Sequence, residues 1–553
     1  MNRYDRMVLT SLLRDGREDV DDDLRELVGL EIFDRREGLS TAERARLAGD
    51  RLRFVLAHVE PPSELVADPP RLIAVHEWAG LVDGALAALL AAHYNLELGA
   101  AMAGGADSDH VRALLAEIAT GAAIGVVLAT ELGAGDDPAG LRTYAEYDPA
   151  AAEFVLRTPG PLAQKFLPDV VVPDVATSAL VMARLVVGGQ ERGIFPFLLR
   201  LTTTGGPAPG VWITPISQRP GWPLSSAVVS FHETRLPYEA LLAGGHAHLS
   251  RDGRLSGPLL GRRERLRQSV ERAQAGRLCA TAGSIATTKS ALSMMTSLAD
   301  HRALLLWVAD TFAAAFLHNG AHRSYAQAQQ AGGGLDDREL RAIAVANAWA
   351  ARTSARILAE SREHCGTQGL LTAERIAQYL VASHVVADAA GGNEWMAGSY
   401  EPPAGSELGP AGADLTDIDF GRYLLRERER GRRHDGPDQA TQAAREGARL
   451  ALDALVAAVE QAEAVGAAGA AATLRRLAAL CALRALQADA AWFLAAELLT
   501  PQQVCALVPE VAGLVAELTP AVADLVAAFD IPADVLRAPI AGLGQRPEPA
   551  AAA

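Results

Sequence analysis

The sequence predicts a mainly α-helical protein with a β-domain inserted in it. Half of the 553 residues are hydrophobic and only 5% are aromatic, and the abundant alanine favours helix because alanine has the highest helix propensity. Apolar residues recur at helical spacing on both sides of the segment from Thr130 to Arg235. Within that segment they alternate with polar residues, which is typical of strands. A chain of this length can form two to four domains.

Residues 1–128 are predicted to form an N-terminal helical domain. Ser40 and Glu43 have the Ser-x-x-Glu spacing of a capping box, which marks the start of a helix. A helix of mostly small residues is expected from about Ile73 to Tyr94. Because small side chains let neighbouring helices approach closely, this helix is expected in a tightly packed interior.

Residues 129–250 are predicted to form a central β-domain. Short segments with β-branched and aromatic residues are separated by clusters of glycine and proline, which is the pattern of strands and turns. The expected strands are 144–147, 153–156, 179–185, 195–199, 211–213 and 227–231.

Helical spacing returns in residues 255–400, which are predicted to form a first C-terminal helical domain. Residues 401–437 are expected to be a linker, in which 402–417 are rich in proline and glycine. The mixed charges of 426–433 are typical of a solvated helix end. A second C-terminal helical domain is predicted for 438–545, and a disordered tail for 546–553.

Charge and cysteine content argue against several kinds of protein. The formal net charge is −16, which disfavours nucleic acid and anionic membranes as partners because both are negatively charged. The four cysteines contain no Cys-x-x-Cys pair, so neither a disulfide framework nor a zinc site is expected. His318 and His322 lack the glutamate of a His-Glu-x-x-His motif, and no metal site is expected there. The scattered cysteines fit a reducing cytoplasm, so a cytoplasmic location is expected. Without a signal peptide or a run of 18 uncharged apolar residues, we expect no membrane span.

The stretch from His364 to Met396 holds two turns of small residues around an apolar helix. The first turn is Cys365–Gly369 and the second is Ala389–Asn393. Glycine in such turns lets the backbone approach a ligand closely, because it has no side chain. On spacing alone, a helix C-cap followed by a loop is the simpler explanation.

The same stretch resembles the acyl-CoA oxidases, a family with the acyl-CoA dehydrogenase fold. In that family a Cys-Gly-Gly-x-Gly turn and a Glu-Gly-x-Asn turn line the flavin and the thioester. Here Thr367 replaces one glycine of the first turn, and Ala390 stands where the family has its catalytic glutamate. The resemblance implies that Gly366, Gly369 and Asn393 contact flavin adenine dinucleotide (FAD).

The β-domain carries a second block of resemblance. Residues 130–135, with the sequence Thr-Glu-Leu-Gly-Ala-Gly, are similar to the family's Thr-Glu-x-Gly-x-Gly segment. In the family this segment touches the flavin ring. The resemblance therefore implies cofactor contacts for Thr130, Gly133 and Gly135.

Two further segments on the cofactor side depart from the family's pattern. Lys165 begins a segment similar to the family's Lys-Trp-x-Pro-Gly-Gly, so the resemblance assigns Lys165 to the cofactor site. Asp169 replaces a glycine of this segment, and a carboxylate there would disfavour a reduced, anionic flavin. The family's loop with an arginine that binds the flavin pyrophosphate is missing between Lys289 and Arg302, and these two residues are the candidates to replace that contact.

Neither of the two positions that the family uses for its general base carries a carboxylate in this sequence. Ala390 occupies the first position, and Gly276 occupies the second, which some relatives fill with glutamate. Glu394 is the carboxylate nearest to Ala390 and is the candidate catalytic base, with Asp388 as the alternative. The structural explanation for Glu394 is that it stabilises a helix N-terminus from the first turn.

The resemblance covers nearly the whole chain, including apolar runs of the last helical domain that carry no chemistry. It implies the acyl-CoA dehydrogenase/oxidase fold: an N-terminal helical domain, a central β-barrel-like domain and two C-terminal helical domains. The helical faces through which family members pair imply a homodimer, with a hetero-oligomer containing a paralogue as the alternative.

Three functions remain open from the sequence. The first is FAD-dependent oxidation of an acyl thioester, carried by CoA or by acyl carrier protein, with a displaced base. The second is other oxidative chemistry on the same fold, such as oxygenation of a carrier-bound substrate. The third is a cofactor-free or non-catalytic protein that binds an acyl thioester or pairs with an active subunit.

Overall fold

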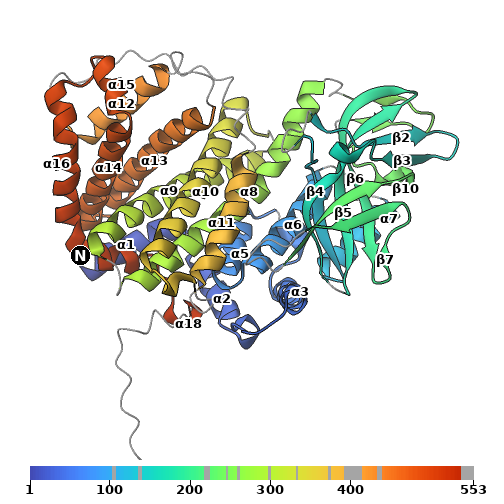
Figure 1. The fold of residues 1–553 in the computed structure, drawn as a ribbon, viewed down its shortest axis with the longest axis horizontal. Helices are drawn as coiled ribbons and strands as arrows, with labels where there is room; N and C mark the ends of the chain where they lie inside the picture. Colours follow the sequence, from blue (N-terminus) through green and yellow to red (C-terminus); the bar gives the residue numbers. More distant parts are fainter. Residues whose placement is uncertain are drawn as a thin grey trace, which may run out of the picture. The chain divides into compact units, whose positions relative to one another are not determined.

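The computed structural model describes residues 1–65, 67–102, 108–134, 140–172, 174–216, 224–243, 247–257, 262–296, 300–331, 334–370, 375–391, 414–431 and 439–536. The chain forms two compact units (Figure 1). The first contains Met1–Gly29, Gly80–Val82 and Thr281–Ala553, and the second contains Leu30–Ala79 and Asp83–Ala280. The predicted mainly α fold with an inserted β-domain is confirmed, whereas the finer division into four domains stays a prediction.

The first 128 residues are mainly helical, as expected. The helices are α1 (Arg3–Arg14), α2 (Glu18–Val28), α3 (Thr41–His58), α4 (Pro62–Leu65), α5 (Pro69–Val82), α6 (Gly84–Met102) and α7 (Asp109–Ala119). The predicted capping box at the start of α3 is present, because Ser40 and Glu43 exchange both hydrogen bonds.

The expectation of a single helix from Ile73 to Tyr94 is wrong, since α5 ends at Val82 and α6 begins at Gly84. Asp83 separates them in an extended conformation, and its carboxylate accepts a hydrogen bond from the Ala85 amide at 2.9 Å. The same carboxylate accepts from the Arg51 guanidinium at 2.6 Å. An aspartate that bonds to nearby backbone competes with the helix, which explains the break.

The β-domain lies in the second unit and confirms the predicted strands. The strands are β1 (Ala123–Leu128), β2 (Tyr144–Asp148), β3 (Glu153–Arg157), β4 (Lys165–Val171), β5 (Ala176–Val187), β6 (Gln190–Thr203), β7 (Gly206–Pro207), β8 (Val211–Pro215), β9 (Ser225–Phe231), β10 (Thr234–Pro237), β11 (His248–Leu249) and β12 (Leu255–Ser256). Among the described residues, one sheet has the order β10-β3-β2-β5-β6-β7 with β1 paired to β5, and a second has the order β4-β9-β8.

The helices after residue 260 follow the expected order. They are α8 (Arg262–Met295), α9 (His301–Ala331), α10 (Asp337–His364), α11 (Ile376–Gly391), α12 (Ile418–Arg430), α13 (Gln439–Ala464), α14 (Ala468–Ala488), α15 (Ala490–Ala495), α16 (Pro501–Leu518), α17 (Val522–Ala527) and α18 (Ala533–Leu536). In the first unit α9, α10, α13 and α14 pack side by side (Figure 1).

The expected linker 401–437 contains a helix, α12, whose presence corrects the expectation for its second half. Phe420 and Leu424 of α12 are buried, and α12 packs against α13 and α14. Arg428, expected in solvent, is only 3% exposed, because its guanidinium bonds to Asp489 at 3.2 Å and lies over the Trp492 ring. The apolar residues of α12 recur at helical spacing, but the charged residues between them made this segment resemble a solvent-exposed run.

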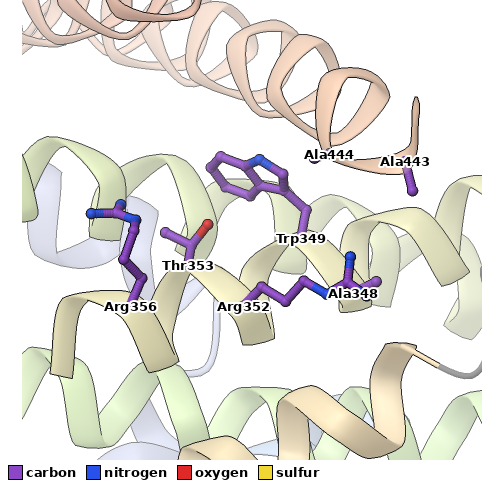
Figure 2. Close-up of a pocket in the computed structure, with 7 residues that line it drawn as sticks. All are labelled: Ala348, Trp349, Arg352, Thr353, Arg356, Ala443 and Ala444. Atoms are coloured by element: carbon purple, nitrogen blue, oxygen red, sulfur yellow. The ribbon is translucent and has the colours of Figure 1, made fainter. Parts of the chain in front are cut away.

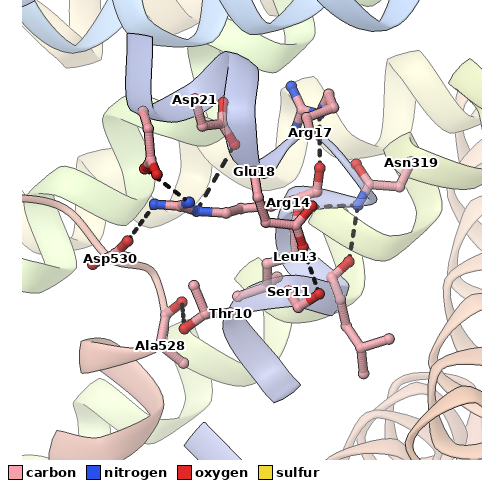
Figure 3. Close-up of polar contacts among 12 residues, drawn as sticks. Thr10, Ser11, Leu13, Arg14, Arg17, Glu18, Asp21, Asn319, Ala528 and Asp530 are labelled. Atoms are coloured by element: carbon pink, nitrogen blue, oxygen red, sulfur yellow. Dashed lines mark hydrogen bonds and ion pairs between the residues drawn. The ribbon is translucent and has the colours of Figure 1, made fainter. Parts of the chain in front are cut away.

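The N-terminal helix α1 belongs to the unit of the C-terminal helices. Arg14 donates to Asp530 at 2.5 Å, and Thr10 donates to the Ala528 carbonyl at 3.1 Å (Figure 3). On the other side, the Asn319 amide of α9 donates to the Leu13 carbonyl at 3.2 Å. These bonds fix the beginning of the chain to α9 and to the segment that follows α17, both more than 300 residues later in the sequence.

Two helical segments among the described residues are long and apolar enough to cross a membrane by length and composition alone. No membrane span was expected, because the sequence contains no run of 18 uncharged apolar residues. In α9 the apolar window is 83% buried within the protein, as in a core helix. In the segment Pro501–Ala527 the window is 17% buried.

Candidate functional site

The segment that begins at Thr130 is anchored on strand β4. The Thr130 hydroxyl donates to the Phe166 carbonyl at 2.7 Å, and the Phe166 amide donates back to the Thr130 carbonyl at 3.2 Å. The Gly133 amide donates to the Leu162 carbonyl at 2.8 Å, and a Cβ on Gly133 would lie 2.9 Å from that oxygen. The close approach of these two backbones therefore requires glycine at position 133.

The side chain of Lys165 is bonded within the protein, and its contact with a cofactor stays a prediction. Its ammonium donates to Glu131 Oε1 at 2.9 Å and to the Met182 carbonyl at 2.7 Å, and both charged side chains are 0% exposed. Glu131 also accepts from the backbone amides of Arg142 at 2.7 Å and Thr143 at 3.0 Å. Burial lowers the pKa of Lys165 to about 8, against the opposing effect of Glu131.

Glu131 is a residue that the sequence reading missed. It lies within the Thr-Glu-x-Gly-x-Gly segment, and its carboxylate joins three elements: its own segment, β4 and the chain before β2. The motif signals that a glutamate belongs there, but the identity of its partners depends on strand pairing. Its charge is compensated in place, so this pair holds the predicted flavin segment in position.

The first small-residue turn is explained by helix termination. Gly366 has a φ of 57°, and its amide donates to the Glu363 carbonyl at 3.0 Å, which is the left-handed conformation that commonly follows a helix. A Cβ on Gly369 would lie 2.6 Å from the Arg362 carbonyl oxygen. Both glycines are therefore needed by the local backbone, and their contact with FAD stays a prediction.

The second turn begins later than expected. Helix α11 continues to Gly391, so Ala390 lies in its last turn. Gly135, Asn393 and the candidate base Glu394 lie outside the described residues, as do the side chains of Asp169 and Asp388. Their roles remain predictions.

The two candidates for a pyrophosphate contact differ in accessibility. Helix α8 ends at Met295 and α9 begins at His301, which leaves room for only a short connection. Lys289 is buried, with 6% of its surface exposed. Arg302 is exposed in the first turn of α9, and its amide donates to Asp300 at 3.1 Å. Of the two, only Arg302 could reach a ligand in solvent.

A separate pocket of about 170 Å³ lies between α10 and α13 (Figure 2). The lining residues are Ala348, Trp349, Arg352, Thr353, Arg356, Ala443 and Ala444. The Arg356 guanidinium is held by Asp310 at 2.6 Å and Glu360 at 3.1 Å. These carboxylates neutralise the charge of Arg356.

Two buried histidines of the second unit each have a ring nitrogen that is unpaired in the described structure. His76 and His93 are 1% and 0% exposed, and the Nε2 atom of each has no hydrogen-bond partner among the described residues. Burial lowers the pKa of each imidazole to about 4. No group of three or more His, Cys, Asp or Glu side chains that could hold a metal ion occurs in the described parts of the chain.

Parts of this chain are similar in sequence to acyl-CoA oxidases. Residues 427–542 match the family model for acyl-CoA oxidase. The human peroxisomal acyl-coenzyme A oxidase 3 is 28% identical over 235 residues, which are 42% of this chain and 33% of that protein. The Arabidopsis thaliana peroxisomal acyl-coenzyme A oxidase 1 is 33% identical over 125 residues, which are 22% of this chain and 19% of that protein. The matched segments thus span a third or less of these relatives.

Solved structures extend the similarity of the fold to almost the whole chain. Acyl-CoA oxidase 1 from Yarrowia lipolytica has a TM-score of 0.79 at 20% identity, covering 97% of this chain and 90% of that one. Acyl-CoA oxidase-1 from Caenorhabditis elegans, complexed with FAD and ATP, has a TM-score of 0.74 at 17% identity, with the same coverage. The acyl-CoA oxidase fold expected from the sequence is confirmed.

The expected cytoplasmic location is contradicted by the same relatives. The human and Arabidopsis proteins are both named peroxisomal. The cysteine pattern that suggested a cytoplasmic location reports only a reducing environment and cannot distinguish compartments that share it.

Proposed function

We propose that this chain, a member of the acyl-CoA oxidase family, is a flavoprotein that binds an acyl-CoA thioester and oxidises it. The observation that carries the proposal is the coincidence of a family match at residues 427–542 with the oxidase fold along 97% of the chain. The Thr130 segment supports it, since the motif that touches flavin in the family forms an ordered structure anchored on β4.

The described residues offer few groups for a flavin. The amides of Leu132, Gly133 and Ala134 already donate to backbone carbonyls, at 3.1, 2.8 and 3.2 Å. The half-buried Thr130 hydroxyl donates to the Phe166 carbonyl, which leaves its oxygen able to accept a hydrogen bond from the ring. FAD, when bound, would accept the hydride. The contribution of the second unit would then be to hold the flavin ring at Thr130.

A second function is favoured by one specific observation. Ala390, in the last turn of α11, cannot remove a proton, and a general base is typically worth about 10²- to 10⁴-fold in rate. The alternative is therefore a non-catalytic or cofactor-free member that binds an acyl thioester or pairs with an active subunit. The short connection between α8 and α9, which replaces the family's arginine loop, favours the same alternative.

The experiment that separates these functions is the absorbance of the purified protein. Stoichiometric flavin, with an absorbance band near about 450 nm that bleaches when acyl-CoA is added without oxygen, is expected for the oxidase. Hydrogen peroxide formed in air would identify dioxygen as the electron acceptor. A colourless protein that still binds acyl-CoA would establish the alternative instead.

A further inference from the structure

The face of α10 that packs against α11 ends near the vacant base position. Ala351 and Ala355 of α10 share a core cluster with Val386 and Ala387 of α11. Farther along α10, Leu358 packs with the first turn of α11, so the two helices run antiparallel along this face.

Asn347 lies at the end of this face where α11 terminates. It precedes Ala351 by four residues and Leu358 by eleven, and these spacings place all three on one side of α10. Helix α11 continues from Ala387 to Gly391, so position 390 lies three residues beyond Ala387, in the last turn of the helix. Asn347 and position 390 therefore lie at the same end of the helix pair.

The Asn347 carboxamide is buried and unsatisfied. It is 0% exposed, and neither its oxygen nor its nitrogen has a hydrogen-bond partner within the residues that the structure describes. An amide can donate two hydrogen bonds and accept two. Because an unpaired buried polar group is costly, such groups are usually satisfied by water or by a ligand.

Some hydroxyl groups of α8 and α10 are also buried without a hydrogen-bond partner in the described parts of the structure. Among the described residues, four buried hydroxyls of α8 and α10 have no partner: Thr281, Ser284, Ser290 and Ser361. Other hydroxyls in the same unit behave ordinarily, since those of Thr287, Thr288 and Ser383 each donate to a backbone carbonyl three or four residues earlier. The unpaired groups are therefore not a general consequence of serine or threonine in these helices.

Helix α8 reaches the same core as the α10–α11 pair. Ala291 and Met294 of α8 pack with Leu358 of α10 and Tyr379 of α11. Ser284 precedes Ala291 by seven residues, which places it on the side of α8 that carries Ala291. The interior of the first unit thus carries polar groups on two helices that border one core, and a purely hydrocarbon chain could satisfy none of them.

We infer that Asn347 is a specificity-determining residue that hydrogen-bonds a polar substituent of the acyl chain. The fitting substrate is an acyl thioester with a hydroxyl or amide group beyond the reacting carbons, because such a group can both donate to and accept from a carboxamide. This inference rests on the proposed function. A site built to hydrogen-bond a substrate hydroxyl discriminates strongly against the analogue that lacks it, because the buried polar group is then left unpaired.

The test compares the binding of decanoyl-CoA with that of hydroxydecanoyl-CoA isomers whose hydroxyl lies beyond C3, measured by calorimetry on the full-length protein. The wild type is expected to bind at least one hydroxylated isomer about tenfold or more tightly than decanoyl-CoA. Asn347→Leu should abolish this preference while keeping or raising the melting temperature, because it removes an unpaired amide and replaces it with a side chain of similar size. The control Ser383→Ala removes a buried hydroxyl that already has a backbone partner, and should keep the preference.

Equal affinity of the wild type for all isomers and for decanoyl-CoA would overturn the inference without any variant. A preference that survives Asn347→Leu, or a melting temperature that falls by many degrees in that variant, would also overturn it, because Asn347 would then be a structural residue. Failure to bind any acyl-CoA would instead contradict the proposed function.

Discussion

Gly80 and Gly283 lie in direct contact where α5 crosses α8. A Cβ on Gly80 would be 2.9 Å from the Gly283 Cα and 3.1 Å from its carbonyl oxygen. Just beyond this point, the Arg375 guanidinium and the Tyr379 hydroxyl donate to the Leu81 carbonyl at 3.0 and 2.7 Å. The end of α5 is therefore held by a backbone contact at Gly283, where no side chain can move aside, and by two side-chain hydrogen bonds to Leu81.

We predict that Gly80→Ala destabilises the protein. The added methyl group meets backbone atoms, and overpacking of this kind typically costs about 1–3 kcal/mol. The control is Gly320→Ala in α9, where a Cβ meets nothing within 4 Å and alanine should stabilise the helix by up to about 1 kcal/mol. Urea unfolding of both variants measures the difference. If the two substitutions changed stability equally, the close crossing of α5 and α8 would be wrong.

A second prediction concerns the buried pair of Glu131 and Lys165. Glu131→Gln should destabilise by about 3–5 kcal/mol, because it leaves an ammonium uncompensated at a 0% exposed position. The double variant Glu131→Leu/Lys165→Met should lose less, because it removes both charges together. Asp109→Asn provides the control, since Asp109 pairs with Arg112 on the surface and such pairs contribute about 0–1 kcal/mol. Thermal unfolding curves of the wild type and the three variants test this order of stabilities. If Glu131→Gln lost less stability than the double variant, the prediction would be contradicted.

A third prediction follows from the buried histidines. Burial lowers the pKa of His76 and His93 to about 4, whereas an unfolded histidine titrates near about 6.5. Both imidazoles are therefore neutral in the folded protein, so the stability that they contribute is complete above pH 6.5 and is lost as the pH falls from there towards 4. Each residue should account for about 2 kcal/mol of loss by pH 5.

The measurement is the free energy of unfolding between pH 7.5 and 4.5. His93→Asn, which keeps an oxygen acceptor available for the Gly125 amide that bonds to His93, should flatten the acid side of this curve. His248→Gln, at an exposed position in β11, should leave the curve unchanged. If the wild type lost no stability between pH 6.5 and 5, the burial of both histidines would be disproved.

Local signals were the most predictable from sequence. The capping box of Ser40 and Glu43 depends on two residues three apart, and it forms as expected. Strands β2 and β3 were predictable because their side chains alternate around a short turn. Strand β1 was missed, because the continuous apolar run from Ala123 to Leu128 does not distinguish a strand from a buried helix.

Contacts between residues far apart in the sequence could not be predicted from the sequence. Glu131 and Lys165 are 34 residues apart, and only the bridge between their backbones makes them partners. The apposition of Gly447 to the Trp349 ring, where a Cβ would come within 2.5 Å, similarly depends on how α10 and α13 pack. The family motifs predicted a flavin segment at Thr130, but they did not reveal that its backbone amides at Leu132, Gly133 and Ala134 are used within the protein.

The last prediction tests the vacant base position directly. Ala390→Glu places a carboxylate in the last turn of α11, where the family motif has its glutamate. If the chain binds flavin and acyl-CoA as proposed, this variant should raise the rate of flavin reduction by acyl-CoA about 10²- to 10⁴-fold. Ala390→Gln is the matched control, because it has nearly the same shape without the basic oxygen. A wild type that already reduces flavin as fast as Ala390→Glu would show that another group removes the proton, and loss of that rate in Glu394→Gln would identify it.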